Sequence, residues 1–116
     1  MSFVNRDALI IYPKQPVFDW ANRIFEENED YGPVDLTRHD SGTVFLIEEQ
    51  PSPEDFEDWI QANYEFFFMT MLEHWTPEES LWPESVSFPM FQEWFHAVYH
   101  SMVLDVEEDP LEQEEY

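Results

Sequence analysis

Apolar positions divide the chain into a first part with short continuous runs and a later part with helical stripes. Residues 8–12 form one short run closed by Pro13, and residues 43–48 form another. Such runs, rich in β-branched side chains, are typical of strands buried on both faces. We therefore expect strands near 8–12 and 43–48, with a further edge strand near 34–37.

Between and after these runs, apolar residues recur every three or four positions, which is the pattern of an amphipathic helix. The first helix would be a right-handed crossover if the two buried strands are parallel. Ser52 and Pro53 are the cap and first-turn residues that helices favour, so they mark the start of the longest helix. The predicted helices lie near residues 16–26, 53–75, 77–82 and 88–104.

These elements predict an α+β fold, with a small two- to three-stranded sheet covered by helices. The length of 116 residues suits one domain. We expect that domain to span residues 1–106. Residues 107–116 are rich in acidic side chains and should form a mobile tail.

The charge of the chain limits its partners. Asp and Glu number 27, Lys and Arg number 4, and the formal net charge is −23, with no Lys or Arg after Arg38. The hydrophobic share of 43% still allows a folded core. Direct binding to nucleic acid or to anionic membranes is disfavoured, whereas a basic protein partner is favoured. Monomer and homodimer both stay open.

Two explanations of the acidity stand out, because a charge of −23 is unusual for an ordinary acidic protein from a mesophile. One is adaptation to a high-salt, halophilic cytoplasm, in which self-repulsion is screened. The other is DNA mimicry, in which carboxylates three or four positions apart on a helix stand in for phosphates and occupy a basic nucleic-acid-binding protein. The candidate interaction row is Glu54, Glu57, Asp58 and Glu65.

The most specific candidate for chemistry is a possible divalent metal site at Glu93, His96 and His100. On the predicted last helix these residues share one face, and zinc accepts two histidines and a carboxylate while leaving an open position. A metal-binding protein or hydrolase would follow. The alternative is an ordinary exposed helix face.

No other cofactor is expected, and without cysteine there is no disulfide or Cys-based zinc site. The chain therefore reads as non-enzymatic rather than catalytic.

Residues 66–69 are apolar around the whole circumference of the predicted long helix. They form either an exposed interaction surface or a part of a central helix that packs on two sides. The central helix is the better interpretation of the two.

The N-terminus lacks the features of a signal peptide, and no stretch approaches the roughly 20 apolar residues of a membrane span. A cytoplasmic protein is the resulting expectation.

Three motifs resemble a family of small, uncharacterised bacterial proteins. They are Pro13-Lys14-Gln15-Pro16 with Trp20, Glu79-Ser80-Leu81-Trp82-Pro83, and Met90-Phe91 with Glu93-Trp94-Phe95 and the later His100-Ser101. The resemblance covers most of residues 6–105. It implies a bacterial, single-domain, cytoplasmic protein, and it implies no site residues because the family has no established activity. Residues 84–87 depart from the family by lacking basic side chains, which favours salt adaptation over mimicry.

Overall fold

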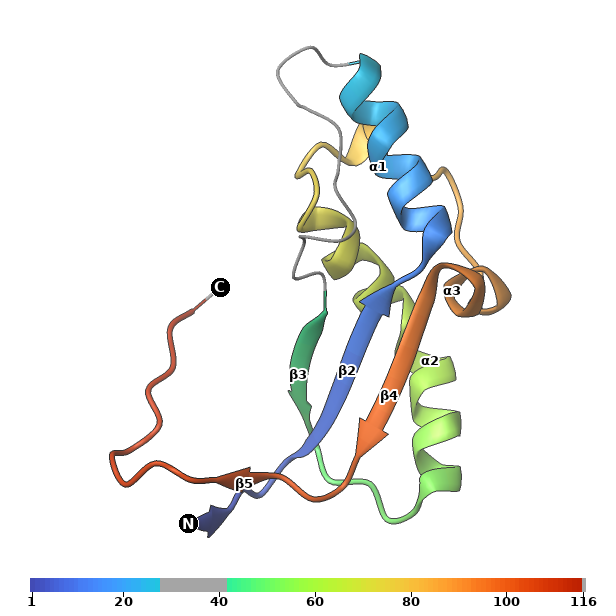
Figure 1. Ribbon diagram of the computed structural model, residues 1–116. Helices are drawn as coiled ribbons and strands as arrows, with labels where there is room; N and C mark the ends of the chain where they lie inside the picture. The colour runs from blue at the N-terminus through green and yellow to red at the C-terminus, as the bar shows by residue number, and fades with distance from the viewer. Residues whose placement is uncertain (28–41, 116) are drawn as a thin grey trace.

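The computed structural model describes residues 1–27 and 42–115, in which a three-stranded sheet carries helices on one face (Figure 1). The α+β fold class predicted from the sequence is thereby confirmed. In chain order the elements are β1 Ser2–Phe3, β2 Asp7–Pro13, α1 Gln15–Glu27, β3 Thr43–Ile47, α2 Pro53–Glu73, the 3₁₀ turn η1 Glu79–Leu81, α3 Phe88–Trp94, β4 Phe95–His100 and β5 Leu104–Asp105.

Strand β2 is the centre of the main sheet, whose strand order is β3-β2-β4. Both pairings are antiparallel, and Leu9 stands opposite Phe45 on β3 and Tyr99 on β4. The two buried strands expected from the sequence are therefore antiparallel neighbours, so α1 is not a crossover between parallel strands. The edge strand predicted near 34–37 lies outside the described residues.

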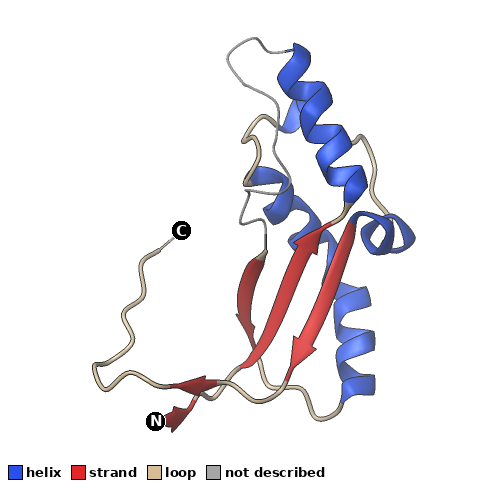
Figure 2. Ribbon diagram, viewed as in Figure 1, coloured by secondary structure: helices blue, strands red, loops and turns tan. Residues whose placement is uncertain are grey.

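Alternation along the strands assigns every strand residue to one of two faces. Leu9 and Ile11 are fully buried, so they and their cross-strand neighbours form the inner face, which packs on the helices. The intervening residues form the outer face, which is turned toward the viewer in Figures 1 and 2, with α2 behind the sheet. The outer face consists of Ala8, Ile10 and Tyr12 of β2, Val44 and Leu46 of β3, and His96, Val98 and His100 of β4.

Helix α2 covers the inner face through a set of aromatic contacts. Ser52 caps the helix by accepting a hydrogen bond from the Asp55 amide at 3.1 Å, as its position before Pro53 predicted. Phe68 is fully buried, and its ring centroid lies 5.1 Å from that of Phe95 and 5.5 Å from that of Trp94. The core therefore lies between α2 and the inner face.

The predicted last helix, 88–104, is wrong beyond its first two turns. Helix α3 ends at Trp94, and Phe95 already has extended backbone angles (φ −134°, ψ 150°) as the first residue of β4. Residues 95–100 fit a helical stripe, but they also alternate inward and outward as a strand. Pairing with the second edge of β2 decides between the two, and this contact is distant in sequence. The helices predicted near 16–26 and 53–75 and the turn near 77–82 correspond to α1, α2 and η1.

A short strand at the N-terminus and another that follows β4 form a second, small ribbon below the main sheet (Figure 1). Strand β1 pairs antiparallel with β5, with Phe3 opposite Leu104. Residues 106–115 have no regular structure, and their side chains are exposed. The boundary at residue 106 and the mobility of the tail stay predictions. No helix in the described part of the chain combines the length and apolar character needed to cross a membrane.

Candidate functional site

Both edges of the main sheet open onto a pocket. Within the described residues, β3 and β4 each pair only with β2, which leaves the outer backbone edge of each strand unpaired. We call the pocket along β3 the β3 groove and the one along β4 the β4 pocket. The β3 groove is lined by Phe45, Leu46, Ile47 and Glu48 with Trp59, Asn63, Phe66 and Phe67. The β4 pocket is lined by Phe95, His96 and Ala97 with Lys14, Phe56, Glu57, Phe88, Phe91 and Gln92.

The β3 groove is an aromatic channel between a strand edge and one flank of α2, with a volume of about 520 Å³. Its base is fixed by ring contacts, because the Phe67 ring lies 5.0 Å from Phe45 and 5.7 Å from Trp59. The Trp59 indole donates a hydrogen bond to the Glu48 carboxylate at 3.0 Å. The last three residues of β3 and the following Glu48 therefore line the groove together with positions i, i+4, i+7 and i+8 of α2.

Residues 66–69 belong mainly to the buried part of α2, which agrees with the prediction of a central helix. Phe67 and Phe68 are buried, on the sides facing β3 and β4 respectively. Phe66 is the exception, because 65% of it is exposed at the mouth of the β3 groove. Its ring packs edge-on against Phe67 at 5.2 Å. An exposed phenylalanine beside an apolar groove is typical of a binding surface.

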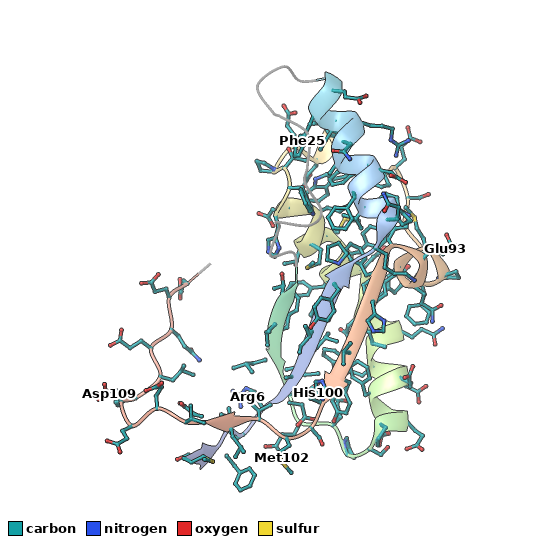
Figure 3. The ribbon with its side chains drawn as sticks, in the orientation of Figure 1. Arg6, Phe25, Glu93, His100, Met102 and Asp109 are labelled. Atoms are coloured by element: carbon teal, nitrogen blue, oxygen red, sulfur yellow. The ribbon has the colours of Figure 1, made fainter. Side chains whose placement is uncertain are left out.

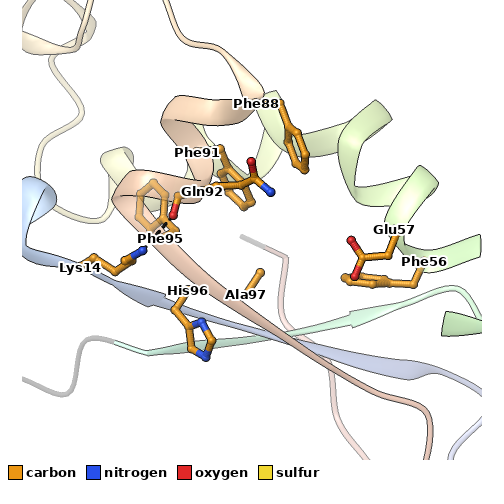
Figure 4. A pocket seen from close by; sticks show the side chains of 9 residues that line it. All are labelled: Lys14, Phe56, Glu57, Phe88, Phe91, Gln92, Phe95, His96 and Ala97. Atoms are coloured by element: carbon orange, nitrogen blue, oxygen red, sulfur yellow. Dashed lines mark hydrogen bonds between the residues drawn. The ribbon is translucent and has the colours of Figure 1, made fainter. Parts of the chain in front are cut away.

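The β4 pocket is smaller, about 270 Å³, and has aromatic walls with polar groups at its rim (Figure 4). Lys14 joins two elements here: its backbone N–H donates to the Trp94 carbonyl at 2.8 Å, and its Nζ donates to the Gln92 carbonyl at 3.0 Å. A lysine at the last carbonyls of a helix satisfies orphan acceptors and complements the helix dipole. Lys14 thus stabilises the place at which α3 gives way to β4.

The titratable groups around the β4 pocket do not converge. In Figure 4 the His96 ring lies on the opposite side of β4 from Phe95 and Ala97, and Glu57 lies at the far end from Lys14. The His96 ring stacks on Tyr12 of the outer face, with centroids 6.4 Å apart. The described residues of this pocket therefore offer a surface for binding rather than a positioned acid–base pair.

The metal site predicted at Glu93, His96 and His100 rests on a helix that the structure does not have. Residues four apart on a strand are about 13 Å apart, too far for their side chains to share one ion. Glu93 lies on α3, well away from His100 at the opposite end of β4 (Figure 3). Within residues 1–27 and 42–115, no three His, Asp or Glu side chains are grouped to hold a metal ion.

The predicted acidic row lies on α2 as expected, and all four of its side chains are exposed. Three of them fall within the first two turns, and the fourth follows two turns later. Glu57 also lines the β4 pocket. The structure therefore places this row on one helix, while its role as an interaction surface stays a prediction. The row is Glu54, Glu57, Asp58 and Glu65.

A buried carboxylate that the sequence analysis missed joins three parts of the fold. Asp7 is 3% exposed, and it accepts hydrogen bonds from the Tyr99 hydroxyl at 2.5 Å and from the Gln50 amide at 2.9 Å. The pKa of Tyr99 is raised to about 12, first by burial of the phenol, and then by its hydrogen bond to Asp7 and by the negative charge of Asp7. The Tyr99 ring stacks on Phe56 at 4.4 Å. Because Asp7 is satisfied and lines neither pocket, we interpret it as a structural clamp. An acid at the start of an apolar run was the only sequence signal.

The motifs that carry the family resemblance meet one another in space. The Trp20 indole donates to the Leu81 carbonyl at 3.0 Å, and its ring lies 6.4 Å from that of Trp94. The backbone of Lys14 is bonded to Trp94 as well. These residues thus join α1, η1 and α3, which is a structural role.

Comparisons of the chain with protein-family models, curated proteins and solved structures give no significant match. The resemblance to a bacterial family therefore stays a prediction, and the functional argument depends on the geometry of the chain itself.

Proposed function

We propose that this chain is a non-enzymatic protein-binding module that takes an extended segment of a basic partner protein along the edge of β3 that no described strand occupies. The observation that carries the proposal is the coincidence, in the described part of the chain, of an unpaired strand edge with the aromatic β3 groove. Proteins with such an edge bind peptides by adding a strand, so that main-chain hydrogen bonds give affinity and side-chain pockets give specificity.

The groove and the charge together define the chemistry of the bound segment. Successive side chains of an extended peptide point to opposite sides, so every second one would enter the groove. Its walls are mainly aromatic and aliphatic, which suits apolar side chains at those positions. The net charge of −23 favours Lys or Arg at the positions between. The preferred segment therefore alternates apolar and basic residues.

The β4 pocket supports the non-enzymatic part of the proposal. The Lys14 amine already donates to the Gln92 carbonyl, which fits a structural cation better than a nucleophile or base. The His96 imidazole lies on the opposite side of β4 from Phe95 and Ala97 and stacks on Tyr12 (Figure 4). Candidate catalytic groups among the described residues are thus separated, whereas apolar binding surface is continuous along β3.

A designed probe tests the proposal directly. A fluorescent ten-residue peptide that alternates valine and lysine should bind the full chain, and the same peptide N-methylated at alternate backbone amides should bind at least about tenfold more weakly, because it cannot donate to β3. Phe66→Ala should also weaken binding, whereas Leu111→Ala, which removes an equally exposed apolar side chain from the tail, should not. Equal binding of both peptides would reduce the interaction to charge alone and reject the proposal.

DNA mimicry is the second candidate, and the observation that favours it is the exposure of the α2 acidic row. Helical carboxylates three or four positions apart have Cβ atoms roughly 5–6 Å apart, which resembles the spacing of charges on a nucleic-acid strand. Under this candidate, the immobilised chain should capture DNA-binding proteins from a bacterial lysate, and duplex DNA should release them. Replacing the four acids by their amides should abolish capture. Capture that duplex DNA does not compete would eliminate this candidate.

A further inference from the structure

The outer face differs from the rest of this acidic protein in having no carboxylate. None of its eight described strand residues is Asp or Glu, although these make up 27 of the 116 residues. Among these eight residues, the titratable ones are Tyr12, His96 and His100. The row on α2, on the other side of the sheet, consists of four exposed acids.

The outer face is also more apolar than an open sheet face should be. Antiparallel sheets with one solvated face alternate apolar and polar residues, whereas strands buried on both faces read as continuous apolar runs. Strands β2 and β3 have the second pattern, yet the described helices pack on their inner side, and among the outer-face residues only Ala8 is buried. Val44 is 62% exposed, Leu46 46% and Tyr12 43%, with Ile10 and Val98 half-buried between them. The sequence therefore indicates a cover that the described part of one chain does not supply.

We propose that this cover is a second copy of the chain, packed outer face to outer face about a two-fold axis. The absence of carboxylates from this face selects this occupant. A basic partner would gain most at the carboxylate-rich surfaces, whereas an uncharged face gives an advantage to a partner that is itself strongly acidic. Two copies with a net charge of −23 each repel one another across most approaches, and the outer face lets them meet without carboxylates in contact.

The area of the outer face sets the strength of this dimer. Three strands about 4.8 Å apart, with seven residues of about 3.3 Å in β2, give a footprint of about 300 Å². Standard stable interfaces bury about 800 Å² per partner, so the dimer is weak and depends on concentration.

Added salt shortens the Debye length from about 10 Å at 0.1 M to about 3 Å at 1 M, which screens repulsion between the copies. Salt therefore strengthens the dimer, the opposite of its effect on a charge-driven complex.

Sedimentation equilibrium of the full chain, from about 10 µM to 1 mM in 0.1 M and 1 M KCl, tests the proposal. We expect a monomer–dimer equilibrium that is tighter in 1 M KCl. Val44→Glu places a carboxylate at the interface and should weaken dimerisation at least about tenfold. His100→Glu should do the same from the other end of the face, in case Val44→Glu disturbs β3.

Phe66→Glu is the matched control, because it adds the same charge to an equally exposed apolar residue that lies in the β3 groove and not on the outer face. It should leave dimerisation unchanged. His100→Glu should conversely leave binding of the valine–lysine peptide unchanged, because His100 lies on β4, at the opposite edge of the sheet from β3, so the dimer and the proposed function can fail separately. A chain that stays monomeric at 1 mM in 1 M KCl, or a dimer that Phe66→Glu disrupts as strongly as Val44→Glu, would overturn the proposal.

Discussion

The two faces of the main sheet are both apolar, but only the inner face is covered by the described helices. Ile10 and Ile11 are neighbours on β2, yet Ile11 is fully buried against the helices and Ile10 lies on the outer face. The inner face is closed by packing against the helices, much of it aromatic. The outer face is equally apolar in sequence but stays uncovered by the described helices. The apolar content of β2 therefore exceeds what packing within the described part of the chain uses.

The matched isoleucines give the largest expected effect. Ile11→Ala should lower the free energy of unfolding by about 2–5 kcal/mol, because it leaves a cavity in the core. Ile10→Ala should lower it by only about 1 kcal/mol or less in the monomer. Urea denaturation of both variants at low micromolar concentration and low salt measures this difference. Equal losses would mean that the outer face is as buried as the inner one.

Tyr99 tests the clamp that fixes the inner face. Tyr99→Phe removes a hydrogen bond from the buried Asp7 carboxylate and should lower the free energy of unfolding by about 1–3 kcal/mol. Tyr64→Phe is the control, because the Tyr64 hydroxyl donates only a long bond of 3.4 Å to the Val86 carbonyl. Urea denaturation of the two variants compares them, and similar stability of both would show that Asp7 does not need Tyr99.

The raised pKa of Tyr99 predicts a smaller, pH-dependent effect. The folded state holds the phenol proton more tightly, since the pKa rises from 10.0 to about 12. The resulting stabilisation is fully present below pH 10 and is lost as the pH rises toward about 12. Unfolding free energies measured between pH 9 and 12 should thus fall more steeply for the wild type than for Tyr99→Phe. Parallel curves would contradict the assignment.

Salt should act on the acidic surfaces rather than on either face of the sheet. Raising KCl from 0.1 M to 1 M screens the repulsion among carboxylates and should raise the melting temperature by a few degrees. Thermal unfolding followed by circular dichroism at low micromolar concentration, where the chain is monomeric, measures this effect. A melting temperature that is indifferent to salt would count against adaptation of this surface to a high-salt cytoplasm.

Local patterns predicted most of the fold, and contacts distant in sequence account for what they missed. Local sequence alone predicts three kinds of element: α1 from its apolar stripe, the start of α2 from the cap at Ser52, and β2 and β3 from their apolar runs. Local sequence does not predict β4, because Phe95 and its neighbours fit either a helix or a strand, and only pairing with β2 decides between them. The ribbon of β1 and β5 involves two residues in each strand, too few for any periodicity.

The candidate site was harder to predict than the fold for the same reason. The α2 row was predicted because helical spacing alone defines it. The metal site was inferred from a helix that ends at Trp94 in the structure, and the Asp7–Tyr99 hydrogen bond joins residues 92 positions apart. The β3 groove requires both a free strand edge and the flank of α2, so Phe66 was its only trace in the sequence.

One measurement tests most directly the claim that the two faces of the sheet have different roles. Amide spectra of the ¹⁵N-labelled chain in 1 M KCl can be recorded from about 20 µM to 1 mM. We predict concentration-dependent shifts that centre on Ile10, Val44 and Val98, with Phe66 and the rest of α2 unchanged. Shifts that instead follow α2, or spectra that do not change with concentration, would contradict the account.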